Sequence, residues 1–192
     1  MRLQSVARGR IVTRIVFAVM RLVTRRDVPD IVKVRYHRPR FFGKPFSELA
    51  QAVMRGPSPW TIGERELFAA LVSARNRCQF CATTHEAVAS AVLDPSIAAA
   101  VVADWRTADV DYPVRATLGL LEKLTLTPDE VGQRDVRAVL DAGVGPEAIR
   151  DAIEVCALSN MINRVADGLD FSLPTTADRA FNTRVLLKVG YR

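Results

Sequence analysis

Apolar residues recur along this chain at helical spacing, and no segment has the period-two alternation of a half-buried strand. Thr61 and Glu64 have the spacing of a capping box, and Pro146 stands at the start of a long apolar segment. A break near Asn76 would place Cys78 at the start of a new helix. We therefore expect an all-helical fold, with further helices over residues 47–55, 96–104, 113–125, 133–142, 146–169 and 177–189.

The first 26 residues have the pattern of a basic amphipathic helix. Arginines recur at spacings of four, seven and four, with aliphatic residues between them: Arg10, Arg14, Arg21 and Arg25. The longest uninterrupted apolar run, 15–20, is far shorter than the roughly 20 residues needed to cross a bilayer. We expect this helix to lie across the core or a partner subunit. Contact with a membrane surface and a mitochondrial transit peptide are the alternatives.

The charge is concentrated at one end of the chain. The net charge is +6, but residues 1–44 carry twelve Lys or Arg against two acids, which is +10, and the other 148 residues carry fifteen against nineteen, which is −4. We therefore divide the chain into a basic amphipathic N-terminal extension, 1–44, and an all-helical domain, 45–192. The distribution argues against a uniformly basic surface, so we expect no nucleic-acid partner.

Cysteine usage points to a reducing compartment. Three cysteines in 192 residues are too few and too unevenly placed for an extracellular disulfide framework. We expect a cytoplasmic protein. The ten glycines form neither a dinucleotide-binding fingerprint nor a phosphate loop, so nucleotide chemistry is not indicated, and we expect no cofactor and no metal.

The chemistry is concentrated in the pattern E-x11-C-x2-C-x3-H, formed by Glu66, Cys78, Cys81 and His85. On one helix the two cysteines and the histidine would fall within roughly 60° of arc. A helix N-terminus and a nearby imidazole both favour a thiolate, which attacks peroxide oxygen and leaves a sulfenic acid. His85 lies one turn after Cys81 and is placed to activate it, while Cys78 is positioned to close a disulfide. Glu66 would hold His85 or accept its proton through water.

Other interpretations of these residues stay open. The cysteine pair could be purely structural, or it could be part of a zinc site with His85 and either Cys156 or His37. Cys156 stands in an apolar run and is expected in a core. A non-catalytic redox sensor or binding protein is one alternative function, and an enzyme of the carboxymuconolactone decarboxylase type is another. For Asn163 and Arg164 we expect structural hydrogen bonds.

The sequence resembles the carboxymuconolactone decarboxylase superfamily, in its alkylhydroperoxidase D-like (peroxidase-related) branch. The resemblance covers roughly residues 37–171 and rests on the cysteine pattern together with the segments HRPRFFGKPF, RGPSPWTIGEREL, SARNRCQFCATTH and SNMINRVADGLDF. It implies an all-helical bundle built on a repeated helical hairpin. It also implies a homo-oligomer, commonly a trimer or hexamer, that reduces a small-molecule hydroperoxide.

By position, the resemblance makes Cys81 the peroxide-reacting thiol, Cys78 its disulfide partner, and Glu66 and His85 the proton relay. Alkylhydroperoxidase D has a histidine just before the second cysteine, where this chain has Phe80. That departure resembles the less characterised branch. It leaves the reductant open, whether a thiol or a lipoyl-type donor, and the sequence does not distinguish hydrogen peroxide from organic or lipid peroxides.

Overall fold

A computed structural model describes residues 1–191, and this part of the chain is built of helices without any strand. The expected all-helical fold is therefore confirmed for these residues. The α-helices are α1 (Gln4–Arg8), α2 (Ile11–Thr24), α3 (Asp30–His37), α4 (Lys44–Arg55), α5 (Ile62–Arg75), α6 (Gln79–Ser90), α7 (Pro95–Asp104), α8 (Tyr112–Leu126), α9 (Gln133–Asp141), α10 (Pro146–Leu169) and α11 (Thr176–Val189). A π-helical turn, Pro39–Gly43, precedes α4, and a 3-10 turn, Pro128–Glu130, follows α8.

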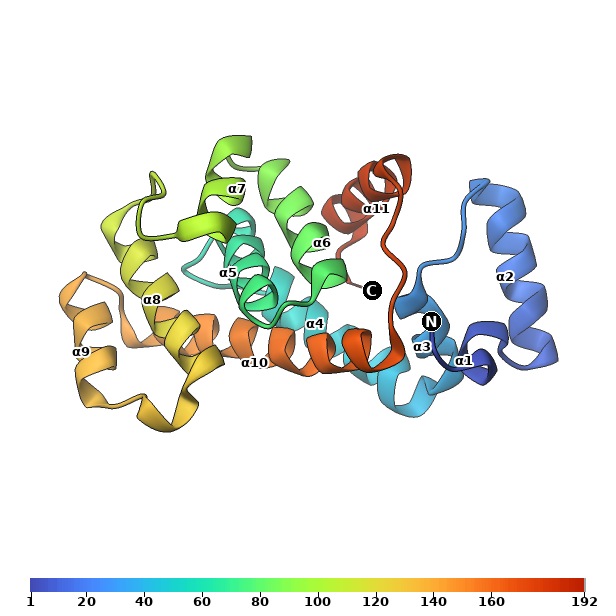
Figure 1. The fold of residues 1–192 in the computed structure, drawn as a ribbon, viewed down its shortest axis with the longest axis horizontal. Coiled ribbons are helices and arrows are strands. Elements are labelled where there is room, and N and C mark those ends of the chain that lie inside the picture. Colours follow the sequence, from blue (N-terminus) through green and yellow to red (C-terminus); the bar gives the residue numbers. More distant parts are fainter. Residues whose placement is uncertain (192) are drawn as a thin grey trace.

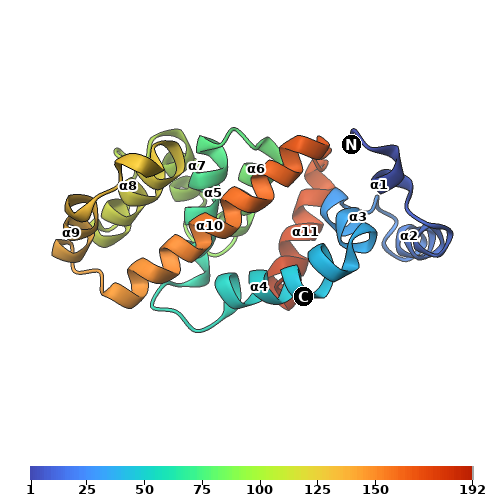
Figure 2. The same ribbon diagram turned by 90° about the horizontal axis from the view of Figure 1, so that it is seen from below.

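The longest helix, α10, runs along the molecule, and the other elements are arranged about it (Figure 1). The helices α5 to α8 lie along one side of α10, and α9 lies at one end. At the other end are α1, α2 and α3, with α2 outermost, and α11 stands between this group and α6 (Figures 1 and 2). The N-terminal segment therefore lies against the end of the molecule at which α6 begins.

Helix α5 is the centre of the core, because it is buried nearly all the way round. Its residues 67–72 are at most 1% exposed. The expected capping box starts this helix: the Glu64 amide donates to the Thr61 hydroxyl at 3.2 Å, and the Thr61 amide donates to the Glu64 carboxylate at 2.7 Å. Such a cap stabilises a helix by about 1 kcal/mol.

A short turn separates α5 from α6 and gives the cysteine pair its position. Arg77 has a left-handed backbone, with φ of 62°, so the chain cannot continue as one helix. Cys78 then stands as the N-cap of α6, and its amide donates to the Ser73 carbonyl at 3.0 Å. The expected break and new helix start are therefore confirmed. The turn folds α6 back along α5.

Helix α2 is present, but its apolar stripe faces outward. Phe17 is its one buried residue among those described, and it packs edge-on against Tyr36 of α3. Six aliphatic side chains of α2 are more than half exposed: Ile11, Val12, Ile15, Val19, Leu22 and Val23. The expectation that this stripe covers the core of its own chain is therefore wrong, while cover by a partner subunit stays a prediction. No helix within residues 1–191 is long and apolar enough to span a bilayer.

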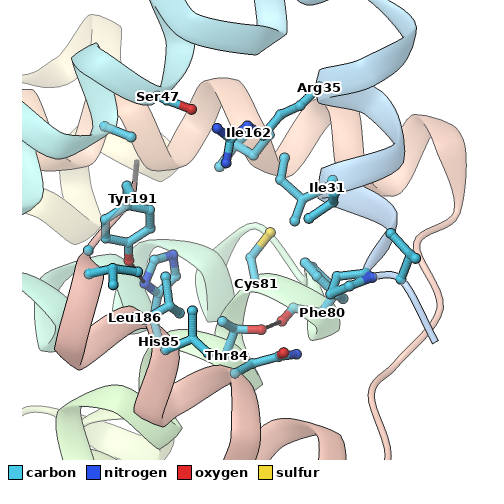
Figure 3. A pocket seen from close by; sticks show the side chains of 18 of the residues that line it. Ile31, Arg35, Ser47, Phe80, Cys81, Thr84, His85, Ile162, Leu186 and Tyr191 are labelled. Carbon is cyan, nitrogen blue, oxygen red and sulfur yellow. Dashed lines mark hydrogen bonds between the residues drawn. The ribbon is translucent and has the colours of Figure 1, made fainter. Parts of the chain in front are cut away.

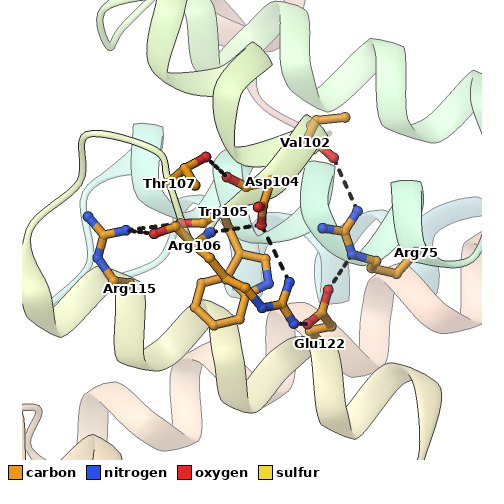
Figure 4. Close-up of polar contacts among 8 residues, drawn as sticks. All are labelled: Arg75, Val102, Asp104, Trp105, Arg106, Thr107, Arg115 and Glu122. Carbon is orange, nitrogen blue, oxygen red and sulfur yellow. Dashed lines mark hydrogen bonds and ion pairs between the residues drawn. The ribbon is translucent and has the colours of Figure 1, made fainter.

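A cluster of ion pairs and hydrogen bonds around Glu122 links three helices of the bundle. Glu122 of α8 accepts from Arg75 of α5 and from Arg106, each at 2.5 Å (Figure 4). The Arg75 side chain also donates to the Val102 carbonyl at 3.1 Å. These contacts join α5, α7 and α8.

Candidate functional site

A cavity of about 470 Å³ opens beside the first turns of α6. Its walls come from α2, α3, α4, α6, α10 and α11, so the N-terminal segment contributes to it together with the rest of the chain. Most of the lining is apolar. Cys81 and His85 face this cavity from α6, and Tyr191 reaches it from the end of α11 (Figure 3). The volume is typical of a site for a small organic ligand.

Glu66 and His85 meet at the floor of the cavity. The Glu66 Oε2 and His85 Nδ1 atoms are 2.6 Å apart, and Glu66 is completely buried. An ionised Glu66 can only accept, so His85 donates from Nδ1 and its Nε2 is left unprotonated in the neutral ring. The pair therefore presents a proton acceptor one helical turn after Cys81.

The other carboxylate oxygen of Glu66, Oε1, also accepts hydrogen bonds. Arg55 donates to Oε1 at 2.6 Å and the Tyr191 hydroxyl donates to it at 2.9 Å. Burial alone would raise the pKa of Glu66, but the charges and hydrogen bonds of His85 and Arg55 outweigh burial and hold the pKa below its usual value. Glu66 is therefore a fixed negative charge in the interior, with both oxygens occupied.

Tyr191 closes this network from α11. Its ring is partly exposed, but its hydroxyl lies among buried groups, and the Arg55 guanidinium stacks 4.9 Å from the ring centre. Burial, together with the negative charge of Glu66, raises the pKa of Tyr191 well above its usual value. The hydroxyl therefore stays protonated and acts as a donor. Sequence reasoning missed both Arg55 and Tyr191, because neither stands at a fixed spacing from the cysteine motif.

The two cysteines differ in access. Cys78 is completely buried in a small apolar cluster with Val34 and Phe171, whereas Cys81 faces the cavity and is 4% exposed. The Cys81 thiol hydrogen-bonds to Cys78 and lowers the pKa of Cys78, against the effect of burial. The same contact, followed by burial, raises the pKa of Cys81. The contact thus favours the thiolate form at the shielded Cys78 over the cavity-facing Cys81.

The remaining candidates lie outside this network. Phe80 lines the cavity and packs edge-on against Phe171, with ring centres 5.2 Å apart. Asn163 accepts from Ser73 at 3.1 Å, and Arg164 donates to Asn76 at 2.9 Å, so both link α10 to the α5 and α6 turn region through structural hydrogen bonds, as expected.

The proposed zinc ligands are not gathered at one place. Cys156 packs in the main core, as expected, with its sulfur 3.5 Å from the Thr125 hydroxyl, whereas Cys78 and Cys81 belong to a separate cluster. His37 is exposed at the end of α3. Residues 1–191 contain no group of three or more His, Cys, Asp or Glu side chains that could hold a metal ion.

Comparisons with known proteins support the fold directly. Neither a protein-family model nor a curated protein matches the chain. A peroxidase-related protein from Silicibacter sp. TM1040 is similar in structure, with 26% identity, a TM-score of 0.73 and 86% of this chain and 85% of that chain covered. A peroxidase-related protein from Ralstonia eutropha JMP134, described as an alkylhydroperoxidase AhpD core, has 23% identity, a TM-score of 0.75 and 95% coverage of both chains.

A third solved structure is similar in fold alone. It is a cysteine-to-alanine variant of the debrominase Bmp8 in complex with 2,3,4-tribromopyrrole, with 15% identity, a TM-score of 0.70, and 97% of this chain and 94% of that chain covered. Both peroxidase-related neighbours are described as uncharacterised. Together the first two confirm the resemblance to the alkylhydroperoxidase D-like proteins that the cysteine motif indicated.

Proposed function

We propose that this protein is a thiol-dependent peroxidase that reduces organic hydroperoxides through the Cys78 and Cys81 dithiol. The observation that carries the proposal is the 2.6 Å contact between the buried Glu66 carboxylate and His85, on the helix whose cavity-facing thiol is Cys81. A proton relay, a reactive thiol and an organic-sized cavity are the parts that hydroperoxide reduction needs. The peroxidase-related neighbours support the same activity.

The first step uses the proton acceptor at His85. His85 takes the proton of the Cys81 thiol, and the Cys81 thiolate attacks the terminal oxygen of the bound hydroperoxide. The O–O bond breaks, Cys81 becomes a sulfenic acid, and the alkoxide leaves as an alcohol after taking that proton back from His85. Glu66 holds the imidazole in position and stabilises its positive charge. Cys81 is oxidised and the peroxide is reduced by two electrons.

The second step forms the disulfide. The Cys78 thiol attacks the sulfenic sulfur, a Cys78–Cys81 disulfide forms, and the thiol proton leaves with the sulfenic hydroxyl as water. The sum of the two steps is dithiol plus ROOH giving disulfide, ROH and water. A thiol or lipoyl-type dithiol donor then reduces the disulfide by exchange. Cys78, which is shielded from the cavity, is suited to this resolving role.

The assembly and location form part of the same proposal. We expect a cytoplasmic homo-oligomer of three or six subunits, and the outward-facing aliphatic stripe of α2 supports burial against another copy. Size-exclusion chromatography with light scattering tests this expectation. A monomer at micromolar concentration would contradict it.

The test of activity is the rate of disulfide formation in pre-reduced protein. We expect cumene hydroperoxide to oxidise the wild-type protein fast, with loss of two thiols per chain and a Cys78–Cys81 peptide seen by mass mapping. Cysteines that stay reduced would contradict the proposal and leave a structural role. A slow disulfide that alters partner binding without turnover would instead indicate a redox sensor, and activity that survives Cys→Ser changes at both positions would indicate a decarboxylase-type enzyme.

A further inference from the structure

One arginine in the cavity wall has no counter-charge. Arg35 extends from α3 into the cavity, on the wall opposite Cys81 (Figure 3). No hydrogen bond or ion pair holds its guanidinium within residues 1–191, although the side chain is partly buried. The other charges of the lining are paired, Arg26 with Asp178 at 2.6 Å and Asp27 with an arginine of α2 at 3.4 Å. The cavity therefore carries one uncompensated positive charge.

A second polar group in the same wall lacks a partner. Ser47 of α4 is only 5% exposed and lines the cavity, yet its hydroxyl makes no hydrogen bond within the described chain. In Figure 3 the Ser47 oxygen and the Arg35 guanidinium lie on the same side of the cavity, across from Cys81 and His85. A buried donor without a partner costs free energy that a ligand acceptor would recover. A guanidinium and a hydroxyl are the donors that a carboxylate prefers.

The space between the two polar ends is apolar. The lining around Arg35 and Cys81 includes Ile31, Phe80 and Ile162, and Leu186 lies beside His85 (Figure 3). Hydrogen peroxide would leave a cavity of about 470 Å³ mostly unfilled and its apolar wall in contact with water. An aliphatic chain would instead cover that wall. The lining thus has an end with a positive charge and a free hydroxyl, a thiol and imidazole on the opposite side, and mostly apolar residues elsewhere.

We propose that the hydroperoxide reduced at Cys81 belongs to an amphipathic carboxylic acid, of the fatty-acid hydroperoxide class. The carboxylate binds at Arg35 and Ser47, the aliphatic chain lies along the apolar wall, and the hydroperoxide group lies at Cys81 and His85. This inference rests on the peroxidase activity proposed above and names its substrate class. Arg35 and Ser47 also line a neighbouring surface cavity, so the carboxylate end lies next to solvent.

The test compares two substrates that differ by one charge. Stopped-flow oxidation of pre-reduced protein is measured with linoleic acid hydroperoxide and with its methyl ester, below their micelle-forming concentrations, with cumene hydroperoxide as the reference. We expect the wild-type protein to favour the free acid by roughly 10- to 100-fold, the range expected for hydrogen bonds to a charged group. Arg35→Gln should reduce this ratio to near one, and Ser47→Ala should reduce it partly. Arg38→Gln changes an exposed arginine three residues on and should leave the ratio as in wild type.

A non-reacting acid gives an independent measurement on the unmodified protein. Oleate carries the carboxylate and chain but no peroxide, and it should protect Cys81 from cumene hydroperoxide, while methyl oleate should protect far less. Equal rates for acid and ester, together with no protection by oleate, would overturn the substrate class and leave the peroxidase proposal standing. No oxidation by any of the three hydroperoxides would overturn the peroxidase proposal itself.

Discussion

The Glu66 carboxylate and the His85 ring are joined by a 2.6 Å hydrogen bond across 19 residues of sequence. The turn at Arg77 makes this possible, because it folds α6 back along α5. Glu66 belongs to a helix whose other faces are core, so its charge can be tolerated only because His85, Arg55 and Tyr191 surround it. The predictions below test this network.

Loss of the His85 imidazole should slow oxidation of Cys81 by about 10²- to 10⁴-fold, the usual contribution of a positioned proton-transfer group. The measurement is the second-order rate of disulfide formation in His85→Ala with cumene hydroperoxide. The matched control is His37→Ala, since His37 is the other histidine of the chain and is exposed away from the cavity. Equal rates in the two variants would remove His85 from the mechanism.

Trapping of the sulfenic acid can test which of the two cysteines reacts with the peroxide. In Cys78→Ser, peroxide should leave a sulfenic acid on Cys81 that dimedone labels, because no resolving thiol remains. In Cys81→Ser, Cys78 should stay unlabelled over the same time, because it is shielded from the cavity. Labelling of Cys78 at a comparable rate would reverse the assignment and give more weight to the lowered pKa of Cys78 than to access.

Acid should destabilise the protein partly through Glu66. Its pKa is lower in the folded than in the unfolded chain, so its contribution is complete above the unfolded value, about 4.5, and is lost as pH falls through the folded value. Urea unfolding of Glu66→Gln should therefore depend less on pH below about 4.5 than that of wild type. The control is Glu86→Gln on α6, whose carboxylate has no hydrogen-bond or ion-pair partner in residues 1–191. If the free energy of unfolding of Glu66→Gln depends on pH in the same way as that of wild type, the lowered pKa of Glu66 does not contribute to acid destabilisation.

Removing the buried partners of Glu66 should destabilise the fold, and loss of the charged partner should cost more than loss of the neutral one. Arg55→Leu should lower the free energy of unfolding by about 3–5 kcal/mol, because it leaves a buried carboxylate without its cation. Tyr191→Phe removes one hydrogen bond to the charged group and should cost about 1.5–3 kcal/mol. Arg134→Leu, at an exposed arginine, should stay within about 0.5 kcal/mol of wild type. Similar losses at all three positions would contradict the proposed role of the network.

The parts of this structure that were predictable from sequence are those set by local rules. The capping box at Thr61, the break before Cys78 and the bounds of α10 follow from spacing and helix chemistry within a few residues of each site. The spacing of the motif also predicts a hydrogen bond between Glu66 and His85 as one possibility, since both residues belong to it. Its distance and its burial depend on how α5 and α6 pack.

The residues that sequence reasoning missed come from distant elements. Arg35, Ser47 and Tyr191 line one cavity with Cys81 only because α3, α4 and α11 converge there, and Arg55 reaches Glu66 from α4. A single arginine, serine or tyrosine has many structural uses, so none carries a signal alone. The direction of the apolar stripe on α2 was likewise not determined by its period, which is the same whether the stripe faces the core or solvent.

The separation of Cys156 from the other two cysteines has a practical consequence for thiol counting. Burial raises the pKa of Cys156, against its contacts with Thr125 and Asn160, and its sulfur lies in another core cluster. Native protein should therefore lose two of its three thiols in a peroxide reaction, and the third should become titratable only in denaturant. The Cys156 thiol therefore serves as an internal standard. If it is oxidised in the native protein, the protein has unfolded, and the thiol loss does not measure turnover.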